Sequence, residues 1–114
     1  MRIIGIVAAL ALPLSLLAQA PPGDAARGKA AFMKQGCYTC HGTAGQGGDR
    51  GSGPRIAYDV FPWEAFTMAV RRPRESMPRF TAEHLPDPDL ADIYAYVAGQ
   101  KRGAKASEIP LLKE

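Results

Sequence analysis

The sequence contains 114 residues, 46% of them apolar and 22% charged, with a formal net charge of +3. This length suffices for one domain, but a core of this size is only marginally stable without additional support. The 14 Lys and Arg residues outnumber the 11 Asp and Glu residues only slightly, and no lysine-rich stripe with interleaved aromatic residues is present. The composition therefore does not indicate binding to nucleic acid.

The first 20 residues, Met1–Ala20, have the three parts of a secretory signal peptide. Arg2 provides the positive n-region, Ile3–Leu17 is an apolar stretch, and Ala18–Ala20 is a small-x-small cleavage site. The apolar stretch is shorter than the ~20 residues that span a bilayer, so an uncleaved membrane anchor is the less favoured alternative. We therefore expect cleavage before Pro21, export, and no membrane span in the mature chain.

Residues 21–114 contain no internal repeat and no second apolar span, and we expect them to form one domain. Its first element is a predicted helix over Ala25–Gln35, because Asp24 is a favourable N-cap and Gly36 a favourable stop. Within a helix, glycine costs about 1 kcal/mol relative to alanine. Gly28 in this helix therefore predicts a close packing contact.

The predicted helix leads into Cys37-Tyr38-Thr39-Cys40-His41, the C-x-x-C-H pattern of c-type haem attachment, which contains both cysteines of the chain. Two thiols three positions apart on one helical turn can form thioethers with the two vinyl groups of one porphyrin. The histidine that follows then lies over the ring, where its neutral imidazole is the proximal iron ligand. We expect one haem c, bound covalently through Cys37 and Cys40 and ligated by His41.

Three other interpretations of this motif are less favoured. A thioredoxin-like Cys-x-x-Cys requires a preceding buried strand in a βαβ pattern, whereas an alanine-rich helical stretch precedes Cys37. A structural zinc site normally has four ligands, and after the motif only His84 remains as a donor of the usual kind. A disulfide between Cys37 and Cys40 would be strained and would leave His41 unexplained.

The glycine-rich residues 42–53 predict a loop, which we expect to lie closely along the haem edge. A short helix is expected next, with Pro62 in its first turn and Val70 at its end. Phe66, Ala69 and Val70 recur at the i, i+3 and i+4 positions, so they are expected to form its inner face.

The segment Pro73–Pro86 contains three prolines and no clear periodicity, which predicts an extended loop. Asp87 as N-cap and Pro88 at the first helical position then begin the last helix, and Gly99 or Gly103 ends it. Its apolar residues recur with helical spacing, namely Leu90, Ile93, Tyr94 and Val97. The tail after Gly103 shows no periodicity and is expected to be mobile.

The sixth iron ligand separates an electron carrier from an enzyme or a gas-binding protein. Met33 is too close to the cysteines to reach the far face of the haem, and Met68 on the short helix is more typical of core packing. Met77 lies in the proline-rich loop, where Pro78 restricts its backbone to an extended conformation. A thioether on a stiff loop can hold iron in both oxidation states, and Met/His ligation raises the reduction potential. Met77 is the expected ligand, and Met68 and His84 are the less favoured alternatives.

With these features, the sequence from Asp24 to Gln100 resembles a small bacterial class I cytochrome c. The resemblance implies an all-α fold of three to four helices around one covalently bound haem, in which the first and last helices cross in close contact. Gly28 and Phe32, against Tyr96, match the positions of that crossing. The resemblance also implies haem attachment after export and a periplasmic location.

The same resemblance assigns roles to residues that follow the glycine-rich loop. In the Gly-Pro-Arg-Ile segment, the Pro54 carbonyl would accept a hydrogen bond from the second ring nitrogen of His41, and Ile56 would pack on the haem. Such a bond fixes the tautomer of a metal-ligating histidine. Trp63 and Arg55 are candidates either for contact with the haem propionates or for ordinary packing.

The sequence thus predicts a monohaem electron carrier, not an enzyme, which cycles between Fe(III) and Fe(II) in the periplasm. It is similar to cytochromes that serve periplasmic dehydrogenases, which implies a dehydrogenase as donor and an oxidase or another cytochrome as acceptor. The alternative is a haem peroxidase or gas-binding protein with an open distal site. Arg71, Arg72, Arg74 and Arg79 flank Met77 and are expected to dock an acidic redox partner or to form a solvated basic face.

Overall fold

The computed structural model describes residues 19–48 and 52–113. The predicted signal peptide Met1–Ala20 lies outside these residues except for its last two. In the described part of the chain the regular elements are helical, and no residue lies in a β-strand. The prediction of an all-α fold is confirmed.

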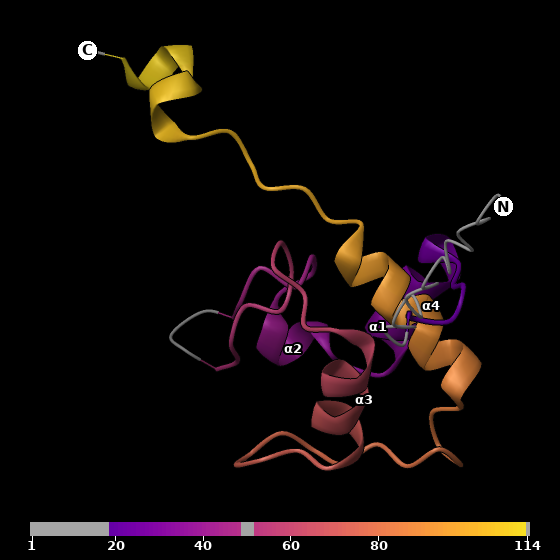
Figure 1. Cartoon of the computed structure of the whole chain (residues 1–114). Coiled ribbons are helices and arrows are strands. Elements are labelled where there is room, and N and C mark those ends of the chain that lie inside the picture. Colours follow the sequence, from indigo (N-terminus) through magenta and orange to yellow (C-terminus); the bar gives the residue numbers. More distant parts are fainter. Residues whose placement is uncertain (1–18, 49–51, 114) are drawn as a thin grey trace, which may run out of the picture.

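Within the described residues, four α-helices are followed by two short 3-10 turns (Figure 1). The elements are α1 (Ala25–Lys34), α2 (Tyr38–His41), α3 (Trp63–Arg71), α4 (Asp87–Ala98), η2 (Ala106–Glu108) and η3 (Pro110–Leu112). α1 and α4 lie side by side, and α2 follows α1 after a tight turn. Among the described helices, none has the length and apolar character that crossing a membrane requires.

The ends of α1 follow the sequence prediction. The side chain of Asp24 accepts a hydrogen bond from the backbone N–H of Arg27 at 2.8 Å, which satisfies one of the free donors of the first turn. Gln35 is the C-cap, and Gly36 follows with a φ of 75°. α1 therefore ends where the polypeptide turns into the Cys37–His41 segment.

The predicted crossing of the terminal helices is confirmed, and its closest point is Gly28. A Cβ at Gly28 would lie 1.8 Å from the backbone oxygen of Asp92 on α4, so only glycine lets the two backbones approach this closely. One turn further along α1, Phe32 is fully buried, and its ring centroid lies 5.5 Å from that of Tyr96. The backbone contact and the aromatic pair together fix the angle between α1 and α4.

A polar clamp next to the crossing was not predicted from the sequence. The buried Asp92 carboxylate accepts hydrogen bonds from the backbone N–H of Asp24 at 2.6 Å and from Nε of Arg27 at 2.8 Å. The Arg27 side chain and the Asp24 N–H together lower the pKa of Asp92. A depressed folded-state pKa means that this contribution to stability is present at neutral pH and is lost as the pH falls through that pKa.

α3 packs on α4 through aromatic side chains. The Tyr94 ring meets Phe66 edge-on at 5.1 Å between centroids and Trp63 at 5.4 Å. Phe66 and Val70 are buried as predicted, but the prediction for Ala69 is wrong, because Ala69 is exposed. The stripe that faces the core runs through residues 63, 66 and 70, at i, i+3 and i+7, and Ala69 lies beside it.

The first residues of α3 and α4 are shifted by one position from the predicted starts. Pro62 is the N-cap of α3 and precedes its first turn, and its carbonyl accepts from Phe66 N at 2.9 Å. Pro86 is the N-cap of α4, so Asp87 is its first residue and makes no capping hydrogen bond. The Asp87 carboxylate instead pairs with Arg71 on α3. α4 ends at Ala98, with Gly99 as its C-cap.

The C-terminal tail extends away from the helices (Figure 1). It contains η2 and η3, which sequence periodicity did not predict because each is a single turn. Arg102 at its start forms an ion pair with Asp59 and lies over the ring of Tyr58, with its guanidinium carbon 5.3 Å from the centroid. Leu111 and Leu112 near its end are exposed.

We expect Gly28→Ala to lower the free energy of unfolding by about 1–3 kcal/mol, because overpacking against Asp92 outweighs the ~1 kcal/mol gain in helix propensity. Denaturant titration of the purified protein measures this change. Gly103→Ala is the matched control, since a Cβ at Gly103 meets no atom within 4 Å. Equal stability of the two variants would contradict the close crossing.

Candidate functional site

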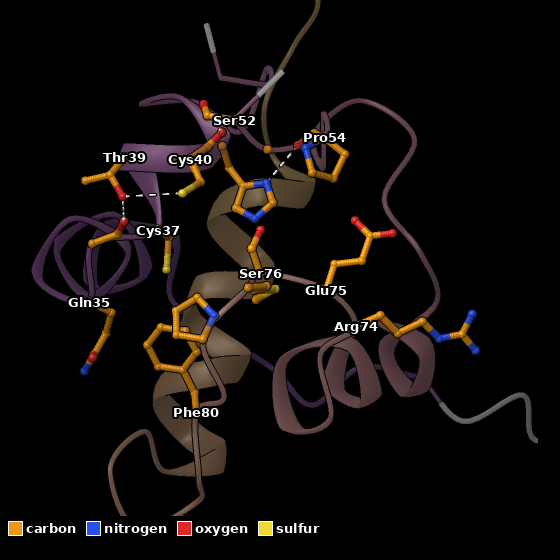
Figure 2. Close-up of a pocket in the computed structure, with 15 residues that line it drawn as sticks. Gln35, Cys37, Thr39, Cys40, Ser52, Pro54, Arg74, Glu75, Ser76 and Phe80 are labelled. Atoms are coloured by element: carbon orange, nitrogen blue, oxygen red, sulfur yellow. Dashed lines mark hydrogen bonds between the residues drawn. The ribbon is translucent and has the colours of Figure 1, made fainter. Parts of the chain in front are cut away.

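A cavity of about 340 Å³ lies where the Cys37–His41 segment faces the loop between α3 and α4 (Figure 2). It is lined by residues 35–37, 39–41, 52–54, 74–78 and 80. Thr39, Cys40, Ser52 and Pro54 are at one side of the view, and Arg74, Glu75, Ser76 and Phe80 are at the other. The volume falls within the range of small-molecule and cofactor sites.

Both cysteines line the cavity as free thiols. Cys37 is half-buried, and burial raises the pKa of its thiol. Cys40 is exposed, and its Sγ lies 3.8 Å from Oγ1 of Thr39 (Figure 2). The Thr39 hydroxyl donates to the carbonyl of Gly36 at 2.7 Å, which ties the start of α2 to the end of α1. The two thiols are thus presented one helical turn apart at one wall of the cavity.

His41 is buried, with only 8% of its surface exposed, and it also lines the cavity. Its Nδ1 lies 2.8 Å from the backbone oxygen of Pro54. A carbonyl oxygen only accepts hydrogen bonds, so Nδ1 carries the hydrogen, and in the neutral ring Nε2 keeps its lone pair. This is the tautomer that a histidine needs to bind a metal through Nε2.

The glycine-rich loop is held close to the backbone of Cys40, and this contact places Pro54. A Cβ at Gly53 would lie 2.4 Å from the Cys40 oxygen, and one at Gly48 would lie 2.1 Å from the same atom. The backbone N–H of Gly48 donates to the Gly53 oxygen at 3.1 Å. The two glycines therefore allow the loop to lie against α2, and the next residue after Gly53 reaches His41.

Met77 is half-buried, lines the cavity and packs against the core. The loop that carries it is closed at its base by a hydrogen bond from Phe80 N to Val70 O at 3.2 Å. Met68 is 65% exposed, and Met33 packs against the core on α1. Neither of these two methionines lines the cavity, so among the described methionines Met77 alone shares it with His41.

Four other candidate residues lie outside the lining of the cavity. Ile56 is half-buried and packs against the core, and its side chain lies next to Gly45. Trp63 packs on Tyr94, and Arg55 forms an ion pair with Asp59 at 3.5 Å. His84 has its Nε2 2.9 Å from Oε1 of Gln35.

Sequence analysis missed several lining residues, among them Gln35 and Phe80. Gln35 was assigned only to the end of the first helix, and nothing in the sequence indicated its contact with His84 across 49 positions. The position of Phe80 could have been inferred from the sequence. An apolar aromatic residue in a loop otherwise rich in charge and proline requires an apolar surface to contact.

The four arginines near Met77 do not form one uniform exposed cluster. The Arg71 side chain is only 17% exposed, and it donates to the backbone oxygen of Phe80 at 3.1 Å and to the carboxylate of Asp87. Arg72, Arg74 and Arg79 are exposed. The expectation that Arg71 belongs to a docking surface is therefore wrong, because its guanidinium is used within the protein.

A protein-family model described as cytochrome c oxidase, cbb3-type, subunit III matches residues 23–97. The matched region begins just before α1 and ends in the last turn of α4, so it contains the whole cavity lining. No curated protein and no solved structure shows significant similarity to the chain.

Proposed function

The chain belongs to the cytochrome c family whose model is described as cytochrome c oxidase, cbb3-type, subunit III, and we propose that it is a one-electron carrier with a His/Met-ligated haem c. It is a small c-type cytochrome, and proteins of this class transfer electrons through haem. The observation that carries the finer proposal is the shared cavity of Cys37, Cys40, His41 and Met77. The two thiols are the groups that form the thioether links of one haem c, and the imidazole and the thioether are the two axial ligands that a six-coordinate haem iron requires.

The remaining residues of the cavity provide both apolar and polar surface, which a flat apolar cofactor with polar substituents requires. Pro54, Pro78 and Phe80 provide apolar surface, whereas Ser52 and Arg74 provide polar groups. The hydrogen bond from His41 Nδ1 to the Pro54 carbonyl fixes the tautomer in which Nε2 is free to bind a metal and holds the ring in one orientation. The iron of a bound haem would supply the Fe(III)/Fe(II) chemistry. The residues around the cavity would hold the two ligand side chains in place.

Both ligand side chains are held by short, stiff segments. His41 ends α2 and is bound at Nδ1, and Met77 is followed by Pro78 in a loop closed at Phe80. A site that moves little between two oxidation states exchanges electrons with little reorganisation, and thioether ligation favours the reduced state. The half-burial of Met77 and the burial of His41 limit access of water to the ligand atoms.

We propose export to the periplasm through the Met1–Ala20 signal sequence, with a dehydrogenase as donor and an oxidase or another cytochrome as acceptor. The family description names an oxidase subunit, which supports an oxidase among the possible acceptors. Covalent haem attachment outside the reducing cytoplasm agrees with export. We propose that the chain is an electron carrier or the cytochrome subunit of a complex, and that it transforms no substrate by itself.

We expect the protein matured with c-type haem to carry one covalent haem. Haem-peroxidase staining after denaturing gel electrophoresis should label the wild-type band, because thioethers at Cys37 and Cys40 survive denaturation. A pyridine haemochrome spectrum identifies the haem type. The double variant Cys37→Ser/Cys40→Ser should lose the label, and haem that acidic acetone extracts from the wild type would contradict covalent attachment.

We expect Met77→Ala to abolish the weak near-infrared sulfur-to-iron charge-transfer band of the oxidised protein and to lower its reduction potential. Met68→Ala is the matched control, because Met68 is 65% exposed and does not line the cavity. It should leave both quantities unchanged. The reduced wild type should not bind carbon monoxide, whereas Met77→Ala should bind it. Carbon monoxide binding by the wild type would support the alternative of a peroxidase or gas-binding protein.

We expect the exposed arginines Arg72, Arg74 and Arg79 to accelerate electron transfer with an acidic partner. Replacing all three by glutamine should slow the oxidation of the reduced protein by ferricyanide, a multiply charged anion, at low ionic strength. The effect should fade at ~0.15 M salt, where the Debye length is about 8 Å. The control is a triple glutamine variant of the tail residues Lys101, Lys105 and Lys113, which carries the same charge change and should react at the wild-type rate. Equal rates of the two variants would contradict a docking role for the three arginines.

A further inference from the structure

We propose that Arg71 is a positioning residue for the iron-ligating loop, an inference that rests on Met77 ligation in the proposed function. Arg71 is the last residue of α3, directly before the loop that carries Met77. Its side chain extends across the base of this loop and binds Phe80 and Asp87, which both follow Met77 in the sequence. The resulting strut joins α3, the loop and α4.

The geometry of the strut is bidentate. Nη1 of Arg71 donates to the backbone oxygen of Phe80 at 3.1 Å, and Nη2 donates to the carboxylate of Asp87, the first residue of α4. The planar guanidinium presents these donors in a fixed fork, so the two acceptors are held at a fixed separation. The Arg71 side chain is only 17% exposed, so its hydrogen bond to the Phe80 carbonyl is shielded from competing water.

Phe80 is the point at which this strut acts on the site. Its backbone N–H donates to the oxygen of Val70 at 3.2 Å, so both polar backbone groups of Phe80 are bound by the end of α3. Phe80 follows Met77 by three residues, and its side chain lines the same cavity. A loop fixed at Phe80 and stiffened at Pro78 leaves the Met77 backbone little freedom to move away.

Comparison with the neighbouring Arg72 shows which feature of Arg71 supports this role. Arg72 has the same side chain but is exposed, and among the described residues it takes part in no ion pair or side-chain hydrogen bond. Arg71→Gln and Arg72→Gln therefore remove the same charge one residue apart. They differ in the loss of the contacts to Phe80 and Asp87.

The test uses the oxidised haem protein and measures its affinity for imidazole, which competes with Met77 for the iron. Binding is followed by loss of the near-infrared sulfur-to-iron band. Arg71→Gln should raise the affinity for imidazole about tenfold, because losing a charge-assisted hydrogen bond makes opening of the loop easier. Arg72→Gln should bind imidazole as the wild type does. Arg71→Lys should lie between them, since one ammonium group replaces a two-pronged donor.

Two further variants separate loop positioning from general stability. Asp87→Ala removes the α4 acceptor and keeps Arg71, and it should raise imidazole affinity in the same direction as Arg71→Gln, which also covers the case that Arg71→Gln does not fold. Asp92→Asn weakens the clamp between α1 and α4, whose partners are Asp24 and Arg27, and should lower the unfolding free energy without changing imidazole affinity. Amide hydrogen exchange at Phe80 should accelerate in Arg71→Gln and in the Asp87 variant, but not in Arg72→Gln or Asp92→Asn.

The outcomes are distinct. Equal imidazole affinities of Arg71→Gln, Arg72→Gln and the wild type would overturn the positioning role and leave Met77 ligation intact. A rise in affinity for Asp92→Asn as large as that for Arg71→Gln would also overturn it, since the effect would then reflect general stability. A wild-type spectrum that lacks the sulfur-to-iron band would overturn the proposed ligation and this inference together.

Discussion

The close approach of α1 and α4 at Gly28 is the constraint on which the rest of the structure depends. Each helix leads directly to one side of the cavity: α1 ends at the turn into Cys37, and α4 begins at Asp87, where the strut from the Met77 loop is bound. The crossing therefore sets the distance between the segment with the cysteines and the loop with the methionine. The Tyr96 hydroxyl extends this control, because it donates to the backbone oxygen of Thr43 at 2.7 Å and so fixes the start of the glycine-rich loop to α4.

The parts of the structure that the sequence predicted are those specified by local chemistry. Asp24 caps α1 because a short carboxylate there can reach the free N–H groups of the first turn. The spacing of Cys37, Cys40 and His41 is imposed by the cofactor itself, which is why so short a segment is informative. The helical periodicity of α4 was also reliable, since Leu90 and Val97, about two turns apart, both face the core.

The features that the sequence did not predict depend on residues far apart in the chain. Asp87 was expected only to cap the last helix and Asp92 was assigned no role, yet Asp87 binds Arg71 and Asp92 binds Arg27 across 65 positions. The sequence alone does not distinguish the role of Arg71 from that of Arg72. Only the direction in which each side chain leaves the last turn of α3 separates a shielded structural donor from an exposed charge. The prediction for Ala69 was wrong for a related reason. A nine-residue helix has two overlapping apolar stripes, and the packing of α3 against α4 decides which of them is buried.

The position of the strut has a consequence for how the proposed iron site responds to the protein around it. Met77 lies in the connection between α3 and α4, and Arg71 bridges the end of one helix and the start of the other. A change in the packing of α3 on α4, for example at the contact of Phe66 with Tyr94, therefore moves both anchors of the loop together. His41 is held by a different contact, the hydrogen bond to Pro54 directly after the glycine-rich loop. A change at the α3–α4 interface therefore acts more directly on the proposed methionine ligand, through the Arg71 strut, than on the proposed histidine ligand.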